Sequence, residues 1–154
     1  MERELDASIA LNPIPNALVW KGRAAFALRG DLPAMKTWLD RIPGRTHTSG
    51  RAVFSTFIWA SLSGQADAGL EALNSYPEAW FSDPEFVGPA ALLRASLLEL
   101  QGKRALAQLQ AQAALVEVHR RIAADPASAD LRIAETWALC GLGRLEEARV
   151  ANRV

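Results

Sequence analysis

Residues 19–43 read VWKGRAAFALRGDLPAMKTWLDRIP, and residues 53–77 repeat their pattern as VFSTFIWASLSGQADAGLEALNSYP. The offset is 34 residues throughout, so Gly30 is in step with Gly64, and Ile42-Pro43 is in step with Tyr76-Pro77. A fixed period of about 20–50 residues marks a solenoid, and a period near 34 is typical of helix–turn–helix repeats. The two stretches therefore predict an all-α fold built from antiparallel helix pairs.

Each copy carries the signals that begin and end helices. From Asn16 to Arg29, apolar residues recur at helical spacing, and Gly30 follows as a residue suited to the left-handed conformation that ends a helix. Asp31 then predicts an N-cap for a second helix, and Pro33 falls in its first turn, where proline is tolerated. The second copy repeats this order around Gly64. The inward positions predicted by the spacing include Val19, Trp20, Leu28, Met35, Trp38, Leu39, Val53, Phe54, Leu62 and Leu73.

The rest of the chain predicts two longer pairs, so that the pairs span about 16–43, 50–77, 88–124 and 129–154 of one domain, 1–154. Residues 1–13 are interpreted as the second helix of a preceding repeat, and the chain ends inside another second helix. We therefore expect a piece of a longer repeat array. Between the second and third pairs, Asp83-Pro84-Glu85 predicts a cap and a short helix. The aromatic residues of this insertion are candidates for partner binding: Trp80, Phe81 and Phe86.

Several short motifs extend the repeat pattern. Gly-Arg-Leu-Glu-Glu-Ala spans Gly143 to Ala148, Gly30-Asp31-Leu32 begins a similar turn, and Ile9 to Pro13 has the form of a closing stretch. With these motifs the chain resembles the tetratricopeptide-repeat family. The resemblance implies a right-handed α-α superhelix in which the first helices of successive pairs line a concave, peptide-binding surface. The last two pairs also resemble the C-terminal repeats of bacterial signalling proteins.

Composition narrows the class of partner. The chain has 17 basic and 17 acidic residues and a formal net charge of zero, so it lacks the positive charge typical of a nucleic-acid binder. It shows no secretory signal and no apolar stretch of about 18 residues that would span a bilayer. Cys140 is the single cysteine, which excludes an intramolecular disulfide and agrees with a reducing compartment. These features predict a cytoplasmic protein that contacts neither nucleic acid nor membrane.

The sequence offers no set of catalytic residues. His47 and His119 are the only histidines, and neither belongs to a metal-binding motif. Cys140 lies beside Leu139 and Leu142, so we expect it to be a buried small hydrophobe rather than a nucleophile. We therefore predict no enzymatic activity, no metal site and no cofactor.

The repeat and the missing catalytic set together predict a non-catalytic scaffold that binds a protein or peptide on its concave surface. Because arginines are frequent on the first helices, an acidic or C-terminal peptide is the expected ligand. The alternative is a regulatory or ligand-sensing segment of a larger bacterial signalling protein, such as a cyclase, kinase or transcriptional activator. Self-association through the terminal repeats stays open in either case. The partner-binding candidates on the first helices are Lys21, Arg23, Arg51, Ser55, Arg94, Glu99 and Arg132.

Overall fold

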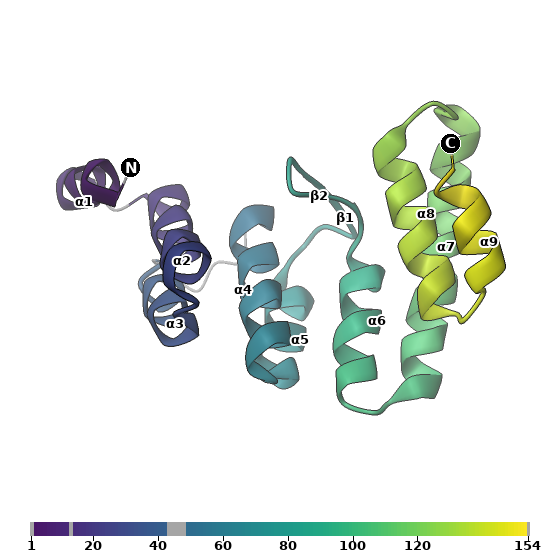
Figure 1. Ribbon diagram of the computed structural model, residues 1–154, viewed down its shortest axis with the longest axis horizontal. Helices are drawn as coiled ribbons and strands as arrows, with labels where there is room; N and C mark the ends of the chain where they lie inside the picture. The colour runs from purple at the N-terminus through teal and green to yellow at the C-terminus, as the bar shows by residue number, and fades with distance from the viewer. Residues whose placement is uncertain (1, 13, 43–48, 154) are drawn as a thin grey trace. The chain divides into compact units, whose positions relative to one another are not determined.

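A computed structural model describes residues 2–12, 14–42 and 49–153 of the chain (Figure 1). This part of the chain is mostly helical and contains one small antiparallel sheet. None of the described helices combines the length and the hydropathy that crossing a bilayer requires. In chain order the elements are α1 (Glu2–Leu11), α2 (Pro15–Arg29), α3 (Leu32–Asp40), α4 (Gly50–Ser63), α5 (Ala66–Ser75), β1 (Trp80–Asp83), β2 (Phe86–Pro89), α6 (Ala90–Leu100), α7 (Arg104–Ala124), α8 (Ala129–Gly141) and α9 (Leu145–Ala151).

The predicted helix pairs are present. Helix α2 packs against α3, α4 against α5, α6 against α7, and α8 against α9. Where the repeat predicted a single domain, the contacts group the chain into two compact units, Met1–Pro77 and Glu78–Val154. The boundary between the units coincides with the end of the second 34-residue copy. Each unit therefore contains two of the predicted pairs.

The turn between α2 and α3 confirms the helix signals read from the sequence. Gly30 has a φ of 66°, in the left-handed region that glycine enters without a Cβ penalty. The Oδ1 atom of Asp31 accepts a hydrogen bond of 2.8 Å from the backbone N–H of Ala34, as an N-cap does. Gly64 repeats the left-handed conformation after α4, with a φ of 70°. The left-handed glycine thus recurs in both copies, whereas Gln65, the residue in step with Asp31, makes no side-chain cap.

The first unit is held by apolar side chains from all of its helix pairs. Leu18 and Val19 of α2, Met35 of α3, Val53 of α4 and Leu73 of α5 are all but inaccessible to solvent. Helix α1 also packs against α2, and Ile9 joins a small cluster with Ala17 and Leu18. Residues 2–11 therefore form the helix that the sequence predicted before the first pair. Full burial of a large aliphatic side chain stabilises a fold by about 1.5–3 kcal/mol.

Three predicted inward positions of the first unit are wrong. Trp20, Leu28 and Leu62 expose 44%, 60% and 53% of their surface. Helix α2 contacts α1, α3 and α4, so its buried face is centred on the line from Leu18 to Ala25 rather than on the stripe through Trp20. Helical spacing predicts that a stripe exists, but the neighbouring helices decide which stripe is buried.

The second unit begins with a β-hairpin in place of the predicted short helix. Strand β1 pairs with β2 in antiparallel register, with Asp83 opposite Phe86 (Figure 1). The Oδ1 atom of Asp83 accepts a hydrogen bond of 3.2 Å from the backbone N–H of Glu85, two residues on. This is an Asx-type turn, in which Asp-Pro makes a tight reversal instead of capping a helix. Phe81 of β1 and Phe86, Gly88 and Pro89 of β2 are buried, whereas Ser82 is exposed.

The hairpin supplies aromatic side chains to the core of the second unit. Phe81 is fully buried and Phe86 nearly so, and their ring centroids lie 5.7 Å apart. Phe86 also meets Trp137 of α8 edge to face at 5.4 Å. Aromatic pairs of this geometry contribute about 0.5–1.5 kcal/mol beyond area burial. Phe81 and Phe86 are therefore core residues, which corrects their interpretation as partner-binding candidates.

Cys140 differs from its prediction as well. It is exposed on α8, while its neighbour Leu139 is 3% exposed. Successive helical residues point about 100° apart, so an adjacent leucine does not bury a cysteine. The interpretation of Cys140 as a buried hydrophobe is wrong.

Candidate functional site

An exposed tryptophan between two arginines forms the clearest candidate site in the first unit. Trp20 and Arg23 are on α2, and Arg51 and Phe54 are on α4. The Cζ atoms of Arg23 and Arg51 lie 5.7 Å and 5.6 Å from the centroid of the Trp20 ring. Arg23 is also 5.9 Å from the centroid of the Phe54 ring. We call these four residues the α2–α4 cluster.

The geometry of the α2–α4 cluster holds positive charge against aromatic surface. A guanidinium within about 6 Å of a ring is attracted by the ring quadrupole, by about 0.5–1 kcal/mol at an exposed site. The packing of α2 against α4 brings these side chains together from residues that are far apart in sequence. Because Trp20 remains 44% exposed, its ring is accessible to a binding partner. The cluster thus combines an exposed aromatic ring with two guanidinium groups.

The structure brings together only part of the predicted set in this unit. Arg23 and Arg51 meet in the α2–α4 cluster. Lys21 is 8% exposed, and its Nζ atom lies 2.8 Å from Oδ1 of Asp6 in α1. Ser55 is fully buried, and its Oγ atom has no hydrogen-bond partner among the described residues. Lys21 and Ser55 are therefore structural residues of this unit, which corrects their interpretation as binding residues.

The candidates predicted in the second unit have separate environments. Arg94 of α6 is half-buried, and this burial lowers the pKa of its guanidinium. The Oε1 atom of Glu99 lies 3.4 Å from Nε of Arg104, across the turn that joins α6 to α7. Arg132 of α8 forms an ion pair of 2.9 Å with Glu135. Trp80 of β1 lies under the guanidinium of Arg121, whose Cζ atom is 3.8 Å from the ring centroid.

Glu135 is the centre of a network that sequence reasoning missed. The carboxylate of Glu135 is nearly buried. Its Oε2 atom accepts a hydrogen bond from Arg132, and its Oε1 atom lies 2.9 Å from Nε2 of His119. These side chains and those of Glu146 and Glu147 line a pocket of about 400 Å³ between α7, α8 and α9. No group of His, Cys, Asp and Glu in the described residues is placed to hold a metal ion. His47 lies outside those residues.

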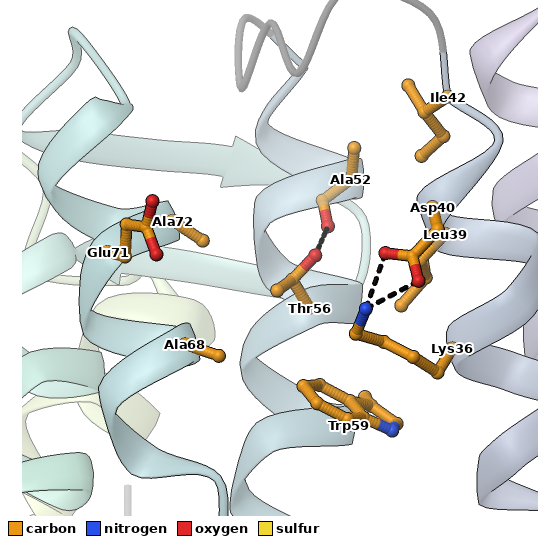
Figure 2. Close-up of a pocket in the computed structure, with 10 residues that line it drawn as sticks. All are labelled: Lys36, Leu39, Asp40, Ile42, Ala52, Thr56, Trp59, Ala68, Glu71 and Ala72. Carbon is orange, nitrogen blue, oxygen red and sulfur yellow. Dashed lines mark hydrogen bonds and ion pairs between the residues drawn. The ribbon is translucent and has the colours of Figure 1, made fainter.

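The first unit contains another pocket, which the sequence analysis did not predict. It has a volume of about 360 Å³ and is bounded by α3, α4 and α5 (Figure 2). Most of its wall is apolar or small, and such residues give no functional signal in sequence. Charged groups lie on two sides of it: Lys36 and Asp40 come from α3, and Glu71 comes from α5. The remaining lining residues are Leu39, Ile42, Ala52, Thr56, Trp59, Ala68 and Ala72.

No family model, curated protein or solved structure matches the chain. The resemblance to tetratricopeptide repeats therefore depends on the sequence motifs and on the helix pairs alone.

Proposed function

We propose that this chain is a tetratricopeptide-like, non-catalytic interaction module that binds an acidic peptide segment at the α2–α4 cluster. The observation that supports the proposal most directly is the exposed Trp20 ring with a guanidinium on each of two helices beside it. In this proposal α2 and α4 are the first helices of successive repeats, and the cluster belongs to their shared concave surface. Binding of this kind requires no catalytic group and no cofactor.

The chemistry of the cluster favours a carboxylate ligand next to an apolar or aromatic side chain. Guanidinium groups recognise carboxylates through paired N–H donors, and such charge-assisted hydrogen bonds are stronger than neutral ones. Tryptophan and arginine are also the residue types most enriched among binding hot spots. A glutamate or aspartate of the ligand would bind Arg23 or Arg51, while a neighbouring side chain covers the Trp20 ring. This arrangement would give the module its preference for acidic partners.

Charge reversal at the cluster tests the proposal. The probe is a fluorescein-labelled peptide of alternating glutamate and leucine, with a glutamine–leucine peptide as its neutral counterpart, and binding is followed by fluorescence anisotropy. We expect the wild-type chain to prefer the acidic peptide. Arg51→Glu should weaken its binding by about tenfold or more, because a hydrogen bond to a charged group contributes about 1.5–3 kcal/mol.

Arg153→Glu provides the matched control, because it makes the same change in net charge at an exposed residue of the other unit. Its affinity for the acidic peptide should stay within about twofold of wild type, because Arg153 is not part of the α2–α4 cluster and exposed substitutions away from such features usually change free energies by at most about 0.5 kcal/mol. Equal binding of both peptides by the wild-type chain would refute an acidic ligand. Equal losses in the Arg51 and Arg153 variants would refute the location of the site.

A further inference from the structure

The pocket between α3, α4 and α5 has the chemistry of a site for a basic side chain. The ammonium of Lys36 is hydrogen-bonded to both carboxylate oxygens of Asp40 at 2.5 Å, and it lies 5.2 Å from the centroid of the Trp59 ring. Lys36 and Asp40 therefore neutralise each other on the α3 side. Glu71, on the α5 side, forms no ion pair with any residue that the structure describes. The lining residues that the structure describes carry one net negative charge.

The floor of the pocket is built to contact a hydrocarbon chain. Leu39, Ala52 and Ala72 are buried beside it, and Trp59 exposes only 9% of its surface. Figure 2 shows Ala52 and Trp59 of α4 between the charged groups of α3 and the carboxylate of Glu71. A volume of about 360 Å³ is at the small end of the range of about 300–1,000 Å³ for ligand pockets. A single long side chain is therefore a suitable occupant.

We infer that this pocket binds an arginine side chain of a partner protein. One positive charge makes the pocket neutral, and the three-carbon stem of arginine matches the apolar floor, as such stems pack on apolar surface elsewhere. The guanidinium presents five N–H donors in a planar fork, so it reaches carboxylates on more than one side, whereas lysine presents a compact, strongly hydrated charge. Glu71 is the principal acceptor, and Asp40 is the second one, already shared with Lys36.

This site is distinct from the α2–α4 cluster, although α4 contributes to both. Arg51 and Phe54 point toward α2, whereas Ala52, Thr56 and Trp59 line the pocket at helical spacing on another face of α4. The inference therefore does not depend on the proposed function. A partner with both acidic and basic residues could engage both faces of α4.

The test uses the full chain and follows the Trp59 indole N–H signal by nuclear magnetic resonance. The probes are acetyl-Gly-Arg-Gly-amide and the same peptide with citrulline, which has nearly the same shape as arginine but no charge. We expect a saturable shift of the Trp59 signal with the arginine peptide. The citrulline peptide should bind about tenfold more weakly or not at all, because it lacks the charge-assisted hydrogen bond to Glu71.

Glu71→Gln should weaken binding of the arginine peptide by about tenfold, while the control Glu78→Gln, at an exposed carboxylate outside the pocket, leaves it unchanged. Ala68→Leu fills the pocket from α5 and should abolish the shift without loss of helical circular dichroism. Arg23→Glu, which disrupts the α2–α4 cluster, should leave the shift intact. An equal response to citrulline, or equal affinity in the Glu71 and Glu78 variants, overturns the inference.

Discussion

At the scale of single residues, Asp31 shows how one side chain fixes the turn inside a repeat. Its carboxylate accepts the N–H of Ala34, one of the donors that the first turn of a helix leaves without a partner. The other side of the turn is fixed by the left-handed conformation of Gly30. Asp31 therefore determines where α3 begins.

We predict that Asp31→Ala lowers the free energy of unfolding by about 1 kcal/mol, because alanine cannot accept the capping hydrogen bond. Asp31→Asn keeps a side-chain oxygen at the same place and should lose far less. Urea denaturation followed by circular dichroism measures both variants. Equal losses would mean that the charge of Asp31, rather than its hydrogen bond, stabilises the helix.

The predicted binding residues show what sequence spacing can and cannot resolve. Arg23 and Arg51 were expected on first helices, and they do meet, around Trp20. Lys21 was expected beside them, but Asp6 of α1 binds it, and the contribution of α1 is not visible in the 34-residue repeat. Ser55 faces the core because α4 is buried over a wide arc. Periodicity therefore predicts the helix that carries a residue better than the direction in which the residue points.

At the scale of elements, Gly22 controls how closely α2 and α3 approach each other. A Cβ atom at this position would lie 3.1 Å from the backbone oxygen of Met35 and 3.3 Å from Cβ of Trp38. Gly141, near the end of α8, offers a matched comparison, because a Cβ atom there would meet only the Cβ atom of Ala111, at 3.4 Å. Substituting alanine at each glycine therefore distinguishes the energetic cost of close packing from the gain in helix propensity.

We predict that Gly22→Ala destabilises the chain by about 1 kcal/mol, because overpacking of about 1–3 kcal/mol exceeds the helix-propensity gain of about 0.5–1 kcal/mol. Gly141→Ala should be neutral or stabilising, since it gains propensity without a close contact. Thermal unfolding of the two variants checks both signs. A stabilised Gly22 variant would show that α3 moves away from α2 at little cost.

The helices were predicted far better than the hairpin. Each helix pair follows from apolar spacing combined with a glycine, and the pair predicted over 88–124 is observed as α6 and α7. The hairpin was missed because Asp-Pro serves equally at the start of a helix and in a tight turn. The hairpin is favoured over a helix because it buries Phe81 and Phe86, and Phe86 contacts Trp137 of α8. This is a tertiary contact between residues far apart in the sequence. Local sequence does not contain that information.

At the scale of the whole molecule, the division into two compact units assigns the hairpin to the second unit. Phe81, the largest fully buried side chain of the described residues, anchors that unit's core. The tetratricopeptide-like superhelix stays a proposal, because it concerns how successive pairs stack. If the two units are independent, each should have its own free energy of unfolding, which hydrogen exchange measures separately for each unit.

We predict that Phe81→Ala destabilises the second unit by about 3–5 kcal/mol, the usual cost of removing a buried phenylalanine. Amide hydrogen exchange should then show lost protection in α6 to α9 and retained protection in α2 to α5. Val87→Ala, at a half-buried position of the same hairpin, should cost less. Uniform loss of protection along the chain would show that the two units unfold as one.

The two turns at Gly30 and Gly64 carry a consequence for stereochemistry. Their φ angles are positive, yet a Cβ atom added at either position would meet nothing within 4 Å. Glycine is thus required at these positions because of the positive φ angle, and not because a larger side chain would clash. A D-amino acid prefers positive φ, so D-alanine would fit both turns while restricting the unfolded chain more than glycine does. L-alanine, with the same atoms, would be strained there. Glycine therefore recurs after 34 residues because both turns need a positive φ, which other L-amino acids adopt only with strain.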